Sequence, residues 1–299
     1  MVNNPSTVIH CKREPPNHNL HTYKFIPPKM ATLTKHDLDV LEKIKDPESG
    51  PSNPLLIDDS LPKDPHITDL STYQGITQRE RDIILSMQDV ELQIAGLKPV
   101  AELSPLSQYQ SCVQSLNDLI GEYPNYASAR NNRAQALRRI YGDLMLVKIS
   151  SAKGPVADVN VPLDTEASEA TIKLASFNAL SDLDRAISLL APNTPWASIS
   201  PQAAKTLSQA LTQRGALYHL SAKQLSSDTE ASVRVDERRR EARWKTIDFE
   251  EAASRDFMTG GRYGNEIAKA LAVSANPTAK LCGDMVRQAM KREMGGGES

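Results

Sequence analysis

The stretch YPNYASARNNRAQALRRI, residues 123–140, combines side chains that could bind a ligand with the spacing of a helix. It holds two adjacent asparagines, Asn131 and Asn132, and the pair Arg138 and Arg139, while small apolar residues recur at three- and four-residue intervals. Amides both donate and accept hydrogen bonds, and guanidinium groups bind carboxylates. This helix could therefore form one wall of a groove that binds a peptide.

From about Thr77 the chain has helical periodicity throughout, because apolar residues recur every three or four positions and no stretch alternates as a strand would. Two turn-rich segments, residues 150–168 and 226–232, are expected to be surface loops. The sequence therefore predicts an all-α fold. Helices are expected near residues 78–102, 105–122, 126–148, 166–191, 200–223, 233–258, 261–273 and 277–293.

The helices repeat a pattern of large and small residues that is typical of tetratricopeptide repeats. Small residues let paired helices approach closely, and large ones fill the space between successive pairs. First helices match at YASARNNRAQAL, with Ala134 at the small position, and at LTQRGALY, with Gly215 there. Second helices match at Cys112, Leu116 and Leu119, at Ala179, Leu183 and Ala186, and at Lys245, Phe249 and Ala252.

This pattern predicts a tetratricopeptide α-α superhelix over residues 76–299, with an unrelated helical bundle as the alternative. Its three helix pairs are expected near residues 85–124, 126–192 and 200–258, and both surface loops fall inside pairs.

Several motifs in this order make the chain similar to the tetratricopeptide repeat protein 36 family. An Asn-Asn-Arg-Ala-Gln motif falls on the second repeat, a Gln-Arg-Gly motif on the third, and Asn-Pro-x-Ala-x-Leu-Cys-x-x-Met closes the domain. These motifs occupy residues 131–135, 213–215 and 276–285. The resemblance covers roughly residues 33–293 if the loops are insertions. It implies a small adaptor that is not an enzyme, with links to heat-shock chaperone binding and protein-complex assembly.

In a tetratricopeptide array the first helix of each pair lines the concave surface. This placement predicts a protein-binding groove that is rich in amides and carries its positive charge on two arginines. Such a surface favours an extended backbone or a mildly acidic segment, so we expect a non-enzymatic adaptor that binds a protein segment. The predicted groove residues are Asn131, Asn132, Gln135, Arg138, Arg139, Gln209, Thr212, Gln213 and His219.

A co-chaperone role is the alternative. Many co-chaperones of this class hold the acidic tail of a heat-shock chaperone in a carboxylate clamp of cations and amides. Only Asn132 matches one of the five clamp positions. The other positions hold Glu91 and Ala95, or Gln93 and Leu97 in a shifted register, and Gln209 and Gln213. Binding to a chaperone would therefore use other surfaces.

Two further arginines, Arg133 and Arg214, occupy the large packing position of their helices. They are expected to bury their stems between repeats and to hydrogen-bond locally. For Arg130, as for Arg138 and Arg139, a solvated surface position is the alternative to a role in the groove.

The composition disfavours several classes of protein. The formal net charge is −2 and aromatic residues make up 5% of the chain, which gives no general reason to expect nucleic-acid or membrane binding. The three cysteines are too far apart for a disulfide framework or a zinc site, and no 18-residue apolar run occurs. We expect a cytoplasmic protein without cofactor or metal, with the nucleus as an open alternative.

Other candidate sites are weak. Cys11 with His18 and His21 lies in a proline-rich segment without a second cysteine pair, so a metal site is not expected. The other two cysteines are expected to be core thiols. His219 has no acid or cysteine partner at helical spacing, so an α-helical enzyme is a less favoured alternative.

Residues 234–245, RVDERRREARWK, form the strongest basic cluster. Interleaved acids at i+3 and i+4 spacing predict an exposed helix whose charges pair with one another. Nucleic-acid binding through this helix is the alternative, and it is disfavoured because few aromatic side chains accompany the arginines for base stacking.

The two ends of the chain differ from the repeats. Residues 1–75 are rich in proline and are expected to form a largely disordered arm with a short helix near residues 33–45, and Met30 is an alternative start. Residues 261–293 are expected to cap the last repeat, with Asn276 and Pro277 starting the final helix. The expected cap residues are Ile267, Leu271, Leu281, Met285 and Met290, with Lys280, Asp284, Arg287 and Lys291 facing water.

Overall fold

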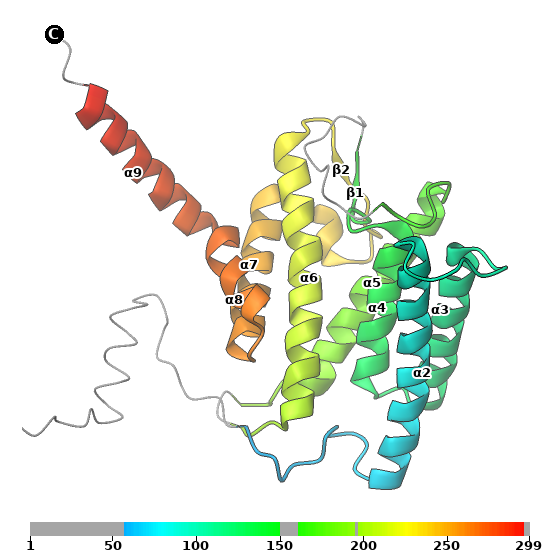
Figure 1. Ribbon diagram of the computed structural model, residues 1–299. Coiled ribbons are helices and arrows are strands. Elements are labelled where there is room, and N and C mark those ends of the chain that lie inside the picture. Colours follow the sequence, from blue (N-terminus) through cyan, green and yellow to red (C-terminus); the bar gives the residue numbers. More distant parts are fainter. Residues whose placement is uncertain (1–56, 150–160, 195–196, 296–299) are drawn as a thin grey trace, which may run out of the picture. The chain divides into compact units, whose positions relative to one another are not determined.

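The structure is a computed structural model that describes residues 57–149, 161–194 and 197–295 of the chain. The described part is an all-α protein with one short two-stranded ribbon (Figure 1). The predicted arm up to residue 56, its helix, Met30 and the Cys11 cluster lie outside the described residues. The helices are α2 (Leu70–Ile94), α3 (Pro105–Glu122), α4 (Ala127–Tyr141), α5 (Glu169–Leu190), α6 (Pro201–Ser227), α7 (Thr246–Arg262), α8 (Glu266–Ala275) and α9 (Pro277–Gly295).

Most helices begin where the sequence supplies a cap. The side chains of Asp69, Ser104, Ser168, Ser200 and Asn265 each accept a hydrogen bond from a backbone N–H in the first turn of a helix. Proline occupies the first position of α3, α6 and α9, where its missing N–H costs no helical hydrogen bond. These signals explain why the predicted starts of these three helices agree with the structure to within a residue.

Each helix from α2 to α8 packs against the next one along the chain, and α4 also contacts α6. The largest core lies among α4 to α8, where Leu183, Tyr218 and Phe257 are fully buried. Two smaller clusters join α2, α3 and α4, and one of them contains Cys112, which is a core thiol as predicted. These contacts hold α4 between α2 on one side and α6 on the other.

Of the three packing positions predicted for α7, Phe249 is buried, Ala252 packs partly against the main core, and Lys245 is wrong. Lys245 is exposed and precedes the helix, whereas Phe249, Ala253 and Phe257 are completely buried at four-residue spacing. Gly215 on α6 lies directly opposite this stripe, because a Cβ atom there would come within 3.0 Å of the Phe257 ring. The close approach of α6 and α7 therefore depends on this glycine.

Several predicted helix boundaries differ from the structure by three residues or more. The helix predicted at residues 78–102 begins eight residues earlier and ends at Ile94, just before Gly96, whose φ is 71°. The helix predicted at residues 126–148 ends at Tyr141, because Gly142 has a φ of 87° that only glycine adopts without strain. The predicted loop at residues 226–232 is shorter, because α6 continues to Ser227.

The predicted helix at residues 233–258 is also wrong in its first half. This segment starts with strand β2 (Ser232–Val233), which pairs antiparallel with β1 (Val147–Lys148) and so ties the segment after α4 to the segment after α6. A 3₁₀ helix η1 (Arg240–Arg243) follows before α7 begins. The ribbon is the one sheet in the described residues, and the sequence did not predict it because these residues show no alternation of polar and apolar side chains.

The C-terminal helices only partly match the predicted cap. Ala268 and Ala275 on α8 are buried, and Leu271 packs partly against the main core. The other four predicted cap residues are more than half exposed, so they do not cover the last repeat: Ile267, Leu281, Met285 and Met290. Cys282 is exposed as well, which corrects its assignment as a core thiol.

Residues 57–69 form no helix but pack against the connection between α5 and α6. The backbone N–H of Asp58 donates to the carbonyl of Ile199 at 3.1 Å, and a ring nitrogen of His66 lies 3.0 Å from the carbonyl oxygen of Leu189. None of the described helices is both long and apolar enough to cross a membrane.

Candidate functional site

A pocket of about 990 Å³ opens along α2, α4 and α6. The middle helix, α4, provides its centre because its side chains bond to both neighbours. On one side Asn132 donates to Glu80 of α2 at 2.7 Å, and on the other Gln213 of α6 donates to the side chain of Asn131 at 2.9 Å. The pocket is therefore a continuous surface built from three helices that are far apart in the sequence.

Eight of the nine predicted groove residues line this pocket. His219 is the exception: its ring packs edge-on against Phe257 of α7, with centroids 6.1 Å apart, and it is not part of the lining. The binding role of the other eight stays a prediction. They are Asn131, Asn132, Gln135, Arg138, Arg139, Gln209, Thr212 and Gln213.

The first of the two pocket arginines, Arg138, is not a free cation. Its guanidinium contacts Asp143 at 2.7 Å, just beyond the end of α4, and it donates to the side-chain oxygen of Gln213 at 3.2 Å. The side chain of Arg138 is only 15% exposed. Its charge is therefore balanced inside the lining of the pocket.

Arg139 is balanced in the same way by α2. Its guanidinium donates to Glu91 at 2.7 Å and to the carbonyl of Val161 at 2.7 Å, and Tyr109 donates to the same carboxylate at 2.6 Å. Burial opposes ionisation of Glu91, but the hydrogen bonds from Arg139 and Tyr109 outweigh burial and lower its pKa. Glu91 is therefore a charged acceptor at neutral pH.

Asn132, the residue that matches the carboxylate clamp, donates a hydrogen bond to a buried acid, Glu80. Glu80 is 6% exposed and accepts hydrogen bonds from Asn132 and from the hydroxyl of Tyr126 at 2.5 Å. Burial raises the pKa of Glu80, and these hydrogen bonds reduce the shift. Asn132 thus positions Glu80 between α2 and α4, in addition to lining the pocket.

These pairs correct the predicted electrostatics of the groove. The expected positive charge on Arg138 and Arg139 is neutralised by Asp143 and Glu91, which also line the pocket. The alternative of solvated arginines is wrong too, because both side chains are less than one-fifth exposed. A chaperone tail that ends in carboxylates would therefore meet no unpaired arginine at these two positions.

The pocket contains amides that are not engaged in this way. Gln88 on α2, Gln135 on α4 and Gln209 on α6 are all exposed and line the pocket. Among the described residues, none forms a hydrogen bond with these three side chains. Gln88 was missed from the sequence although it lies three residues before Glu91, on the same helical face. Apolar side chains also line the pocket: Ile84, Met87, Leu92, Ala95 and Ala136.

A second set of polar contacts lies away from the pocket and joins consecutive helices. Arg133 on α4 donates two hydrogen bonds of 2.6 Å to Asp182 on α5 and a third to Asn117 on α3. Arg130 also contacts Asp182, whose side chain is 1% exposed. The structural role predicted for Arg133 is confirmed, and Arg130 is not merely solvated.

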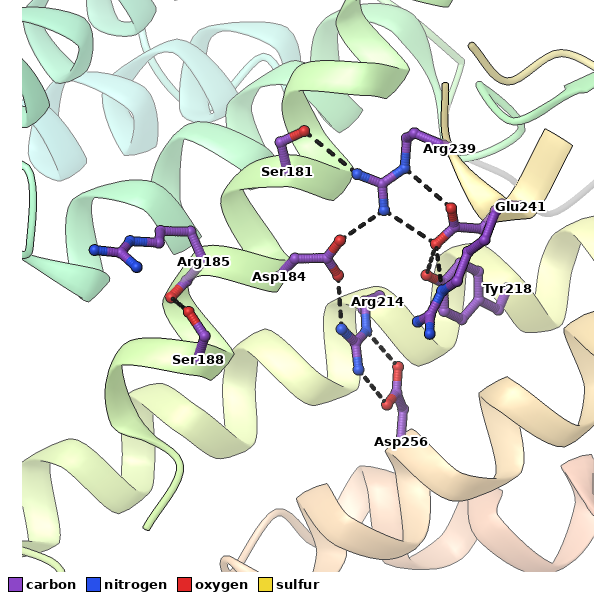
Figure 2. A network of polar contacts seen from close by, with 10 residues as sticks. Ser181, Asp184, Arg185, Ser188, Arg214, Tyr218, Arg239, Glu241 and Asp256 are labelled. Atoms are coloured by element: carbon purple, nitrogen blue, oxygen red, sulfur yellow. Dashed lines mark hydrogen bonds and ion pairs between the residues drawn. The ribbon is translucent and has the colours of Figure 1, made fainter. Parts of the chain in front are cut away.

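The corresponding cluster on α6 is larger (Figure 2). Arg214 donates to both oxygens of Asp256 on α7, at 2.8 and 2.7 Å, and to Asp184 on α5 at 2.6 Å. Arg239 shares Asp184 from the other side at 2.6 Å. The predicted structural role of Arg214 is confirmed as well, because it connects three helices.

Residues 234–245 are consequently not the exposed helix that the charge pattern predicted. Glu241 is completely buried and accepts hydrogen bonds from Arg239 and from the hydroxyl of Tyr218 (Figure 2). Arg238 is exposed, lies over the ring of Phe177 and pairs with Asp236. Arg239, which bonds to Asp184 of α5, and Glu241, which bonds to Tyr218 of α6, therefore anchor this segment.

The fold and the pocket together define a helical protein in which alternate helices form an open surface of polar and apolar side chains. The described residues contain no group of three or more His, Cys, Asp or Glu side chains placed to hold a metal ion.

Comparison with known proteins finds two relatives that are similar to this chain over most of its length. It is 34% identical over 274 residues to the L-tyrosine degradation gene cluster protein hmgX of Aspergillus fumigatus, covering 91% of this chain and 97% of that protein. It is 30% identical over 265 residues to the tetratricopeptide repeat protein 36 homolog of Drosophila melanogaster, covering 88% and 97%. The chain belongs to the family of these proteins. No family model matches the sequence, and no solved structure matches it.

Proposed function

We propose that this chain is a non-enzymatic tetratricopeptide repeat adaptor that binds a segment of a partner protein in the pocket along α2, α4 and α6. The observation that carries the proposal is that alternate helices supply the three long walls of one open pocket, which is lined by polar and apolar side chains. In a tetratricopeptide array the first helices of successive pairs provide the concave binding surface in this way.

Two features that recur in the pairs α4–α5 and α6–α7 support the repeat. An arginine on the first helix bonds to a buried aspartate on the second in both later pairs: Arg133 to Asp182, and Arg214 to Asp256. The residue after each arginine is small, Ala134 in one pair and Gly215 in the other. The name of the Drosophila relative also refers to this repeat.

The name of the Aspergillus relative suggests where to look for the partner. That protein is named for an L-tyrosine degradation gene cluster. We propose that the partner of this chain is a protein of L-tyrosine degradation, bound in the cytoplasm. A heat-shock chaperone is the competing partner, and the paired state of Arg138 and Arg139 disfavours it.

Photo-crosslinking from the pocket tests this function. A photoreactive residue replaces Gln135, which is exposed in the pocket, or Gln114, which is exposed on α3 and is not part of the pocket lining. Each full chain is irradiated with purified enzymes of L-tyrosine degradation and, separately, in a cell extract, and the crosslinked peptides are identified by mass spectrometry.

We expect one defined protein segment to crosslink at position 135 and not at position 114. An identical set of products at both positions would contradict the proposal, because the pocket would then be no more than an ordinary surface. A chaperone C-terminal tail crosslinked at position 135 would favour the competing partner.

A further inference from the structure

We propose that the pocket accepts an uncharged, extended segment and holds its backbone through three glutamines, Gln88, Gln135 and Gln209. This inference rests on the proposed function, because it names the class of segment that the same pocket binds. It differs from the expectation of an acidic ligand that the two arginines suggested.

The three glutamines are placed as a row across the pocket. Glu80 and Glu91 of α2 bond to Asn132 and Arg139 of α4, so the stretch of α2 that contains Gln88 faces the stretch of α4 that contains Gln135. On the other side, Gln213 of α6 bonds to both Asn131 and Arg138, whose midpoint is again near Gln135. Gln209 lies one helical turn before Gln213.

A glutamine side chain suits recognition of a peptide backbone. Its amide carries two donors and one acceptor oxygen, so it can pair with an N–H and a C=O of an extended chain as a neighbouring strand would. These three amides are exposed and have no partner among the described residues, in contrast to Asn131, Asn132 and Gln213. A chain that crosses three helices spaced about 8–10 Å apart would need about six extended residues.

The charges of the pocket define what the segment should lack. Arg138 and Asp143 form one pair and Arg139 and Glu91 form the other, so these four groups sum to zero. An acidic side chain would meet an arginine that already bonds to a carboxylate, and a basic side chain would meet a carboxylate that already bonds to an arginine. Either charge would leave water without gaining an unpaired counter-ion, so an uncharged segment loses least on leaving water.

Apolar side chains of the segment have a place on the α2 side. Met87 and Leu92 line the pocket there, and the chain continues into a loop where Leu97 and Val100 are 73% and 76% exposed. The backbone N–H of Leu97 bonds to the carbonyl of Leu92 at 2.8 Å, so the exposed loop starts at the edge of the pocket. Alternate residues of an extended segment could therefore rest on this apolar edge.

Selection from a displayed library of random peptides, about twice this length, tests the inference. The full chain is compared with the variant Gln88→Ala/Gln135→Ala/Gln209→Ala and with Glu91→Gln, each checked for native helicity. Glu122→Gln is the matched control, because Glu122 also pairs with an arginine, Arg79 at 2.6 Å, but is not part of the pocket lining.

We expect the native chain to enrich peptides that the triple variant does not retain, with apolar residues and fewer acids than the starting library. Their affinity should change less than about threefold between low and high salt, because no net charge is exchanged. Glu91→Gln leaves Arg139 without its acid and should shift the enriched peptides toward acidic sequences, whereas Glu122→Gln should not.

Different results would contradict the proposed adaptor function and the proposed binding of an uncharged segment. Acidic peptides that bind the native pocket and are released by salt would overturn this inference and leave the adaptor function standing. Equal enrichment by the native chain and the triple variant would remove the role of the glutamines. The absence of any peptide that depends on the pocket would overturn the proposed function together with this inference.

Discussion

Arg214 and Asp256 join α6 to α7 through two parallel hydrogen bonds, at 2.8 and 2.7 Å, and Arg133 joins α4 to α5 through the same arrangement with Asp182. In both pairs the aspartate is almost completely buried. Bidentate geometry fixes the rotation of one helix against the other as well as the distance between them. The pocket depends on this order, because α4 and α6 carry its lining on their other faces.

Removing one partner should therefore be costly. Asp182→Ala leaves the guanidinium groups of Arg130 and Arg133 without their acid, and we expect the free energy of unfolding to fall by about 3–5 kcal/mol. Asp118→Ala removes an exposed carboxylate from α3 and should change it by less than about 0.5 kcal/mol. Denaturant titration of both variants checks this, and equal effects would show that the buried pair does not stabilise the fold.

Because Gly215 lies against Phe257, we expect a glycine-to-alanine substitution there to lower stability, whereas helix propensity alone would predict an increase. Alanine usually stabilises a helix interior relative to glycine by about 0.5–1 kcal/mol, and Gly75→Ala on α2 should do so because nothing lies within 4 Å of its added Cβ. Gly215→Ala should instead destabilise the protein by about 1–3 kcal/mol, because its Cβ would meet the Phe257 ring at 3.0 Å. Thermal unfolding of the two variants gives the comparison, and stabilisation by both would contradict the close packing.

The pH dependence of stability should report on Glu80. Burial raises its pKa above the ordinary 4.5, so the folded state holds the proton more tightly than the unfolded chain. The stabilising contribution is complete below about pH 4 and is lost as the pH rises through the folded-state pKa. We expect the native chain to lose stability relative to Glu80→Gln as the pH rises above about 4. Urea titrations at several pH values measure this difference, and a constant or opposite difference would contradict the assignment.

The buried acid Glu241 should protect the segment before α7 from cleavage by trypsin. Glu241→Ala removes the acceptor of Arg239 and Tyr218, so residues 234–245 should detach from α5 and α6. We expect faster tryptic cleavage within this segment than in the native chain. Glu237→Ala, an exposed neighbour, should leave the rate unchanged. Equal rates for the two variants would mean that the network does not hold the segment.

The all-α fold could be predicted from the sequence because its determinants are local. Apolar periodicity set the helices, and capping residues such as Ser104 and Ser200 set several starts. Gly142 ends α4 because of its positive φ, and a glycine is a helix-end signal in the sequence. The apolar residues after Gly142 continue the helical period, so the sequence predicted a helix that is too long. The ribbon of β1 and β2 has two residues in each strand, too few to show alternation.

The electrostatics could not be predicted in the same way. Arg139 meets Glu91 across 48 residues and Arg239 meets Asp184 across 55, so the partners are unrelated in sequence. The pattern of charges in residues 234–245 suggested pairs at helical spacing, but burial of Glu241 against Tyr218 decided the conformation instead. Helical positions were predictable, whereas the charge state of the pocket required the tertiary structure.

The most direct test of the account measures binding of the best peptide from the native chain by calorimetry, with a matched pair of triple variants. Replacing Gln88, Gln135 and Gln209 by alanine should weaken binding about 100-fold, since each neutral hydrogen bond contributes about 1 kcal/mol. Replacing the exposed Gln74, Gln78 and Gln114, none of which lines the pocket, should leave the affinity unchanged. Equal affinities for both variants would contradict recognition by the pocket.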